Sequence, residues 1–252
     1  MPILTQVAAI GDWIYFAFRS ALSAMVVIFS PGLWLRPYYH VFLGGVPLAT
    51  VLGVGLGLVI WMHTRGLLLR TAGAVDLLPT FLAVAVLLEL APVGAGLIVA
   101  ARTGASLGAE LASMRVAEQI DALEMLGVSP WRRLIGPRVL AVTLAVPCLH
   151  VLVATSAILS GYVAEQITGS TTMLKYQAAV LQELRLNEVL PAGLKTLVFG
   201  YLIGVTGCWI GLKAEGGSEG VGRAATDSVV SCCLLVLLAD VVLVGLTRLL
   251  IG

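Results

Sequence analysis

Three ionisable residues, Glu89, Lys195 and Asp240, lie inside long apolar segments of this sequence. A charge at the middle of a bilayer costs on the order of 3 kcal/mol on insertion scales, so each residue is expected to have a partner or a role. Counting about 1.5 Å per residue along the expected helices places all three in the same half of the membrane. Two interpretations remain open: a structural charge pair that holds helices together, and a polar spot in a cavity that binds lipid.

A second concentration of charge lies between residues 102 and 138, which hold nine of the 29 charged residues. Acidic and apolar residues recur there at helical spacing on two sides of a predicted short helix. The acidic residues are Glu118, Asp121 and Glu124, and the apolar ones are Ile120, Leu123 and Leu126. Gly127 and Pro130 predict the end of this helix. From the residues alone, a solvated loop at the lipid headgroups and a docking surface for a partner are both open.

The motifs of ATP binding and of metal chemistry are missing from the sequence. None of the three lysines follows a glycine, so there is no GxxxxGK[ST] and no P-loop in this chain. The histidines lie far apart, and the four cysteines lie in apolar segments, which predicts neither a metal site nor a disulfide framework. We therefore expect no catalytic residue and no cofactor in this chain, and no basic tract suggests nucleic acid.

The elements that must position these residues are apolar helices, because the chain is 59% hydrophobic and only 12% charged. Five segments are long enough to span a bilayer. They cover about Leu43 to His63, Leu77 to Ala101, Val139 to Val163, Glu188 to Leu212 and Ala224 to Leu250. Four glycine pairs at i, i+4 spacing predict close helix packing: Gly53/Gly57, Gly104/Gly108, Gly200/Gly204 and Gly207/Gly211.

Two further helices are expected at the membrane surfaces. Residues 7–30 combine aromatic side chains with Asp12 and Arg19, which favours a helix in the interface that ends at Pro31-Gly32. Residues 170–187 are amphipathic and predict a short helix on the outer face. Its apolar stripe comprises Leu174, Ala178, Leu181 and Leu184.

The predicted fold class is therefore an all-α integral membrane protein with five transmembrane helices. An N-terminal interfacial helix, a charged cytoplasmic helix and a short outer-face helix complete it. We expect one membrane domain over residues 1–252, divided into an interfacial helix (1–32), a transmembrane core (40–250) and the charged segment (102–138) within that core.

The basic residues predict the orientation of the chain. With a cytoplasmic N-terminus, nine of them fall in cytoplasmic segments and five in outer ones. The nine are Arg19, Arg36, Arg102, Arg115, Arg132, Arg133, Arg138, Lys213 and Arg223, and the five are Arg65, Arg70, Lys175, Arg185 and Arg248. The charged segment is thus expected in the cytoplasm.

Residues 89–141, ELAPVGAGLIVAARTGASLGAELASMRVAEQIDALEMLGVSPWRRLIGPRVLA, resemble the signature block of the MlaE/YrbE family. These proteins are the permease subunits of lipid-transporting ABC systems. The likeness combines an E-L-x-P-V start, an R-[ST]-G-[AS]-x-x-x-A-E-[LI] stretch, an E-Q-[IL]-x-[AS]-L-x-x-[LM] helix and a following P-R. GGSEGVGRAATDSVV resembles the last cytoplasmic turn of the family and the entry to its final helix. The resemblance extends from about residue 40 to 250, and the N-terminal helix matches only in character.

The resemblance implies a homodimeric permease. It fits a bacterial inner membrane or a plastid envelope, and the lack of an Arg/Ser-rich transit peptide favours the bacterial inner membrane. Its implied partners are a second copy of itself, a cytoplasmic ABC ATPase that binds ATP and Mg²⁺, an MCE-domain lipid-binding protein, in some systems a STAS-domain protein, and the lipid. In such permeases the ATPase holds the short helix between the second and third spans. Here that coupling helix is Ala117 to Leu126, and its implied contact residues are Glu118, Asp121, Leu123 and Glu124.

The same resemblance matches Glu89, Lys195 and Asp240 to intramembrane charges of the family and favours the lipid cavity for them. Leu88 stands where relatives can carry arginine, which leaves Lys195 as the expected partner of Glu89. If the helix is unbroken from Glu89 to Met114, movement of the coupling helix would reach this site directly.

Two other functions remain as alternatives. An ion- or proton-coupled secondary transporter would use Glu89 and Asp240 as its ion sites, but five spans do not divide into two equal halves. A membrane scaffold that transports nothing is the third class.

Overall fold

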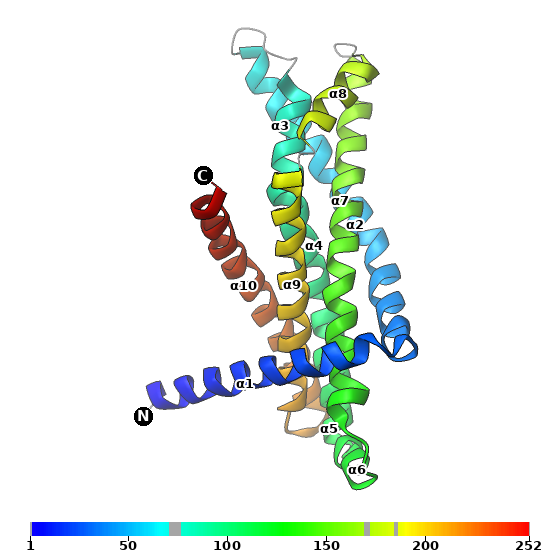
Figure 1. The fold of residues 1–252 in the computed structure, drawn as a ribbon, viewed down its shortest axis with the longest axis vertical. Coiled ribbons are helices and arrows are strands. Elements are labelled where there is room, and N and C mark those ends of the chain that lie inside the picture. Colours follow the sequence, from blue (N-terminus) through cyan, green and yellow to red (C-terminus); the bar gives the residue numbers. More distant parts are fainter. Residues whose placement is uncertain (1, 71–76, 169–171, 184–185, 252) are drawn as a thin grey trace.

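The structure, a computed structural model, describes all residues except 1, 71–76, 169–171, 184–185 and 252. Its described elements are all helical, which confirms the predicted fold class. Six of these helices are long and apolar enough to cross a membrane, one more than predicted. The additional one is α1 (Pro2–Ile28), which lies across the foot of the bundle whereas α2, α7 and α9 run along it (Figure 1). This crosswise direction is the one expected for the predicted interfacial helix, which would lie in the plane of the membrane surface.

The helix α2 (Pro31–Arg70) is almost twice as long as the predicted first span. Forty residues correspond to about 60 Å, whereas the hydrocarbon core of a bilayer is about 30 Å thick. The prediction that Pro31-Gly32 only ends the first helix was incomplete. Pro31 also begins the second, because the first position of a helix needs no N–H donor and suits the fixed φ of proline.

A second long helix runs without interruption from Leu78 to Val116, which confirms the expected continuity between Glu89 and Met114. It contains two π-helical turns. Its parts are α3 (Leu78–Ala85), η2 (Val86–Leu90), α4 (Ala91–Val99), η3 (Ala100–Gly104) and α5 (Ala105–Val116). A π turn adds a residue to the helical repeat, and such turns are frequent at functional sites. Glu89 lies in the first of these turns and Arg102 in the second.

Within the charged segment, α5 and the short helix that follows it form a helical hairpin. After α5 the chain reverses at Glu118, whose φ of 56° is left-handed, and enters α6 (Gln119–Met125). Gly127, at φ 73°, ends this helix: its N–H donates to Glu124 O, and the N–H of Val128 donates to Leu123 O. This is a Schellman cap, and it needs a residue that tolerates positive φ. The glycine stop predicted from the sequence is confirmed.

The remaining helices complete the bundle and its end opposite α6, which is called the outer end here after the predicted orientation. They are η4 (Trp131–Ile135), α7 (Gly136–Thr168), α8 (Met173–Glu183), α9 (Leu186–Leu212) and α10 (Gly217–Ile251). The helix predicted over residues 170–187 is present as α8 (Met173–Glu183), and the residues buried against the bundle are not those of the predicted apolar stripe. Tyr176 and Val180 are buried, whereas Leu174 and Leu181 are exposed. Tyr176 faces inward because its hydroxyl donates to Ile158 O at 3.1 Å.

The predicted stripe of this outer helix also included Ala178, which is exposed, and Leu184, which lies outside the described residues. Burial raises the pKa of Tyr176, with a smaller contribution from the Glu165 carboxylate. The tyrosine therefore stays a neutral hydrogen-bond donor. Apolar exposure on a surface helix says little by itself about which side packs, because α8 has lipid, water and protein all within reach.

Glycines set the close approach of α2 to α7. A Cβ at Gly57 would collide with Ala157 O and Ser160 Oγ, and one at Gly53 with Ser156 Oγ. Ser160 Oγ donates across this contact to Val54 O at 3.1 Å. The other three predicted glycine pairs also lie against neighbouring helices: Gly104/Gly108 against α10, Gly200/Gly204 against α7, and Gly207/Gly211 against α5. The packing interpretation of these pairs is confirmed.

Gly57→Ala is expected to destabilise the protein by about 1–3 kcal/mol, because the added methyl group meets backbone and the helices must separate. The measurement is the thermal unfolding midpoint of the detergent-solubilised protein. Gly55→Ala is the matched control, since nothing lies within 4 Å of a Cβ at Gly55. Equal midpoints for the two variants would contradict the glycine-mediated contact.

A buried ion pair joins the outer ends of α2 and α7. The side chain of Glu165 is fully buried and accepts from Trp61 Nε1 at 2.8 Å and from Arg65 Nη1 at 2.9 Å. A buried carboxylate is tolerated only with such partners. These contacts hold α2 and α7 together beyond their glycine contacts.

The helix α10 is fully buried only along its first half, whereas Ala239 and Leu243 in its second half are partly buried. Its buried residues recur at i, i+4 and are Ala224, Ser228, Cys232 and Val236. After Val236 none of the described residues of α10 is buried, and Figure 1 shows this half diverging from α9. The outer half of α10 therefore offers an apolar surface that this chain itself does not cover.

Candidate functional site

Lys195 brings the three intramembrane charges together. Its Nζ lies 2.9 Å from Glu89 Oε2 and 3.1 Å from Asp240 Oδ1. The three residues come from η2, α9 and α10, so one side chain connects three helices. The Lys195 side chain is 6% exposed, whereas that of Glu89 is 45% exposed. The sequence predicted that these charges would meet, and the structure places them in contact.

The cluster carries one positive charge for two carboxylates. Leu88, which precedes Glu89, adds none, so Lys195 is the cation that Glu89 contacts. His150 on α7 is a further polar neighbour that sequence reasoning treated as merely structural. It is buried, hydrogen-bonds with the backbone of Leu87 and lies within electrostatic range of Lys195. Its Nε2 has no hydrogen-bond partner in the described part of the chain.

The half-exposed carboxylate of Glu89 lies near the start of the second half of α10, because it shares Lys195 with Asp240, which follows Val236 by one turn. The three charges line none of the three pockets that stand out in the described residues. Chemically, the cluster can present carboxylate oxygens and an ammonium group to a polar headgroup.

The second predicted site, on α6, projects beyond the foot of the bundle (Figure 1). Ile120 is buried and attaches the helix to the bundle, and Glu118 and Glu124 are exposed. Asp121 is also exposed, but it forms an ion pair with Arg115 at 2.6 Å. Leu123 is only half-buried.

The most exposed apolar residues of this segment are Met125 and Leu126, at 89% and 78%. Sequence reasoning missed Met125 and placed Leu126 on the same side as Ile120. The helix ends at Met125, so Leu126 leaves the helical repeat and turns outward. The predicted helix stop at Gly127 could have indicated this, because only Ile120 and Leu123 of the predicted apolar stripe lie within a helix that ends there.

The pentapeptide Gly104–Gly108 has the G-x-S-x-G spacing of a hydrolase nucleophile elbow. That motif needs a sharp turn from a strand into a helix. Here it lies inside a continuous helix, at the junction of η3 and α5, and the described residues contain no strand. The geometry gives Ser106 no role as a nucleophile.

These features define a multi-pass helical membrane protein with a short charged helix at one end. The family model of permease MlaE matches residues 34–246, and the chain belongs to this family. It is 39% identical to a probable ABC transporter permease protein of Rickettsia typhi over 152 residues, or 60% of this chain. It is 37% identical to the chloroplastic protein TRIGALACTOSYLDIACYLGLYCEROL 1 of Arabidopsis thaliana over 207 residues, or 79% of this chain.

A probable ABC transporter permease protein of the cyanobacterium Synechocystis is 34% identical over 168 residues. These matches cover 59% of the Rickettsia protein, 56% of the plant protein and 64% of the cyanobacterial one. The chain thus aligns with somewhat over half the length of these relatives. What it shares with them is the permease region.

Proposed function

We propose that this chain is the permease subunit of an ABC transporter that moves phospholipid or a related lipid between its membrane and an extramembrane MCE-domain carrier. A separate ATPase subunit, with ATP and Mg²⁺ bound to it, supplies the energy. The observation that carries the proposal is the position of α6. It is a charged helix with an exposed apolar end, and it protrudes from the bundle at the tip of a long membrane helix.

The connection between α6 and the charge cluster supports an external motor. The uninterrupted helix from Leu78 to Val116 carries Glu89 in its first π turn and leads directly into the turn at Glu118. A displacement of α6 by a bound ATPase therefore moves the helix on which Glu89 lies. Because Glu89 contacts Lys195, α9 and α10 are connected to the same movement.

The lipid substrate is supported by the chemistry around the cluster. An ammonium group and two carboxylates lie beside the apolar, uncovered half of α10, which suits a molecule with a polar head and acyl chains. The name of the plant relative includes the name of a lipid, trigalactosyldiacylglycerol. The proposed lipid site comprises Glu89, Lys195 and Asp240.

A second copy of the chain is the proposed cover for the outer half of α10. Its exposed residues include Leu238, Val241 and Val242, at 63% to 71%, and they lie next to Asp240. Two copies that meet there would enclose the charge clusters in a shared cavity. This arrangement completes a site that the single chain leaves open.

The proposed location is a bacterial inner membrane with a cytoplasmic N-terminus. The end of the bundle with α1 and α6 also carries the arginines of α5 and η4, among them Arg115, Arg132 and Arg133. Basic residues accumulate on the cytoplasmic side of membrane proteins. This orientation places α6 where a cytoplasmic ATPase would reach it.

The test is reconstitution of the full chain with its ATPase in proteoliposomes that contain a fluorescent phospholipid, with an MCE-domain carrier outside. We expect lipid transfer to the carrier that requires ATP and stops when the ATPase cannot hydrolyse it. Transfer driven by a proton or ion gradient without ATP would instead favour the secondary transporter with Glu89 and Asp240 as ion sites. No transfer under either condition, with the subunits still bound, would favour a scaffold.

A further inference from the structure

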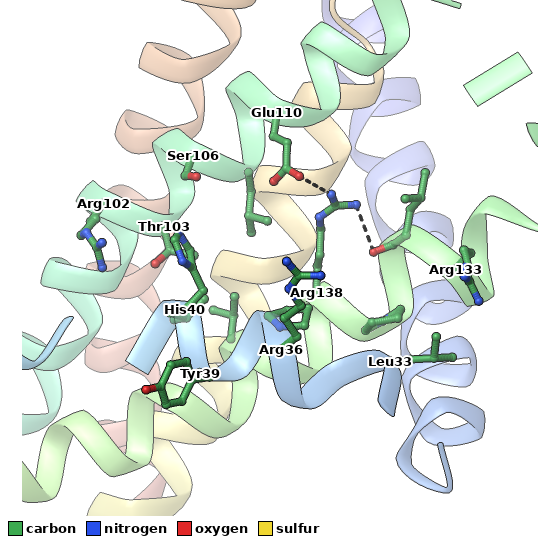
Figure 2. A pocket seen from close by; sticks show the side chains of 16 residues that line it. Leu33, Arg36, Tyr39, His40, Arg102, Thr103, Ser106, Glu110, Arg133 and Arg138 are labelled. Carbon is green, nitrogen blue, oxygen red and sulfur yellow. Dashed lines mark hydrogen bonds and ion pairs between the residues drawn. The ribbon is translucent and has the colours of Figure 1, made fainter. Parts of the chain in front are cut away.

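A basic pocket of about 710 Å³ lies at the end of the bundle opposite the charge cluster (Figure 2). It is formed by the first turns of α2, by η3 with α5, and by η4 with the start of α7. Four arginines line it: Arg36, Arg102, Arg133 and Arg138. Neither the coupling helix nor the intramembrane charges contribute to it.

The positive charge of this pocket is mostly uncompensated. Its one carboxylate is Glu110, which pairs with Arg138. For Arg36, Arg102 and Arg133, no described carboxylate lies within ion-pairing distance. Four arginines against one glutamate leave a net charge of +3. Figure 2 shows Arg36 pointing from α2 toward Arg138, with Arg102 and Arg133 on either side.

The pocket has a glycine that makes room for one of its arginines. The guanidinium group of Arg102 lies against the backbone of Gly44 in α2, where a Cβ would collide with it. Arg102 itself comes from the π turn η3, which alters the direction of side chains on this helix. Thr103 and Ser106 add hydroxyl groups to the lining.

The pocket lies at the level of the crosswise helix α1. Trp131, two residues before Arg133, contacts α1 through Phe16, at 4.9 Å between ring centroids, and through Arg19, at 4.4 Å. Ser23 Oγ donates to Trp131 O. On the α2 side, the aromatic residues Trp34, Tyr38 and Phe42 are in mutual ring contact. Tryptophan and tyrosine collect at the depth of the lipid headgroups, so the arginines lie at that depth.

We propose that this pocket binds a phosphate-bearing anion, namely the headgroup of an acidic phospholipid in the cytoplasmic leaflet. Guanidinium groups bind phosphate oxygens through paired, charge-assisted hydrogen bonds. Basic pockets between membrane helices on the cytoplasmic side bind anionic headgroups. The acyl chains would extend along the apolar surface of α2, which is exposed at Leu43 and Val51. The site is separate from the proposed transport site, so its occupancy does not depend on transport.

Native mass spectrometry of the full chain in detergent tests this proposal. The protein is titrated with phosphatidylglycerol or with phosphatidylcholine of the same acyl chains. We expect phosphatidylglycerol to bind at least tenfold more tightly than phosphatidylcholine, and Arg36→Ala/Arg102→Ala to remove that preference. Retention of the full preference in the double variant would overturn the site.

Gly44→Ala gives a second variant that changes no charge. The added methyl group displaces the flexible end of Arg102, so we expect several-fold weaker phosphatidylglycerol binding in a folded protein. Gly55→Ala, on the same helix and in open space, is expected to bind like the wild type. Gly44→Ala binding that equals the control would overturn the role of Arg102.

Inorganic phosphate distinguishes the two sources of the anion. With a lipid headgroup as the ligand, millimolar phosphate leaves phosphatidylglycerol bound, because the acyl chains add affinity. If phosphate displaces the lipid completely, and the wild type does not prefer phosphatidylglycerol to phosphatidylcholine, the ligand is a soluble phosphate and the lipid assignment is overturned.

Discussion

Lys195→Met is expected to destabilise the protein by about 3–5 kcal/mol, because it leaves Glu89 and Asp240 beside each other in an apolar bundle without their cation. Methionine keeps most of the length of the lysine side chain, so the loss reflects charge rather than volume. The thermal unfolding midpoint of the purified protein, measured with and without its partner subunits, reports the effect. ATP-driven lipid transfer is expected to fall at least tenfold in the same variant.

Lys213→Met is the matched control for this substitution. Lys213 also pairs with a carboxylate, Asp12, at 3.3 Å, but both side chains are more than half exposed. Exposed pairs contribute little, about 0–1 kcal/mol. A loss of stability in Lys213→Met as large as that in Lys195→Met would contradict the special position of the cluster.

The triple variant Glu89→Gln, Lys195→Met, Asp240→Asn separates the two interpretations of these charges. Neutralising a whole buried ion network can leave stability nearly unchanged, since no charge remains unpaired. If the charges serve only to hold η2, α9 and α10 together, the triple variant recovers both stability and lipid transfer. Recovery of stability without transfer would assign the charges to the lipid site. Wild-type transfer in all of these variants would end the transport interpretation.

The sequence predicted the helices and the meeting of these charges because both follow from strong physical costs. A long apolar run has few structures other than a membrane helix, and an ionisable residue within it needs a partner. Lys195 was the one lysine inside a span, and its depth agreed with those of Glu89 and Asp240, so a contact among the three was an available expectation. Gly57 and the other small residues indicated helix contacts for the same reason: close backbone approach needs them.

The side of a helix on which a given residue lies could not be predicted in this way. The two π turns shift the faces of the helix from Leu78 to Val116, and no residue pattern announced them. The basic pocket was hidden because Arg36 is far from Arg102 and Arg138 in sequence, and no pattern indicated that the three would meet. On α8 the apolar stripe did not identify the side that packs against the bundle, because leucines such as Leu174 can face lipid as readily as protein.

The coupling helix shows the same limit in its details. Its existence and its end followed from periodicity and Gly127. Its exposed surface did not, because Arg115 pairs with Asp121 and the exposed apolar residues Met125 and Leu126 lie at the very end of the helix. The contact surface proposed for an ATPase is therefore best described by Glu118, Glu124 and the exposed pair Met125 and Leu126, with Asp121 and Leu123 at its edge.

Met125→Asp/Leu126→Asp is expected to abolish both binding of the ATPase subunit and ATP-driven lipid transfer. The two side chains are 89% and 78% exposed at the end of α6, so carboxylates there are solvated and the permease itself stays folded. In an interface, however, each buried carboxylate would lack a partner, and losing an apolar contact at its centre costs about 2 kcal/mol or more. Two such losses correspond to roughly a thousandfold weaker association.

Co-purification of the ATPase with a tagged permease measures this loss. Equal unfolding midpoints of the double aspartate variant and the wild-type permease verify that the variant is folded. Leu174→Asp is the control, because Leu174 is 81% exposed on α8 at the opposite end of the bundle and its substitution should leave the complex intact.

Glu118→Ala/Asp121→Ala/Leu123→Ala tests the surface first predicted from the sequence. We expect this triple variant to weaken the complex less than the double aspartate variant, since Asp121 is paired within the chain. An ATPase that stays bound to both variants would show that α6 is not its attachment point, and the proposed transmission along the helix to Glu89 would then fail.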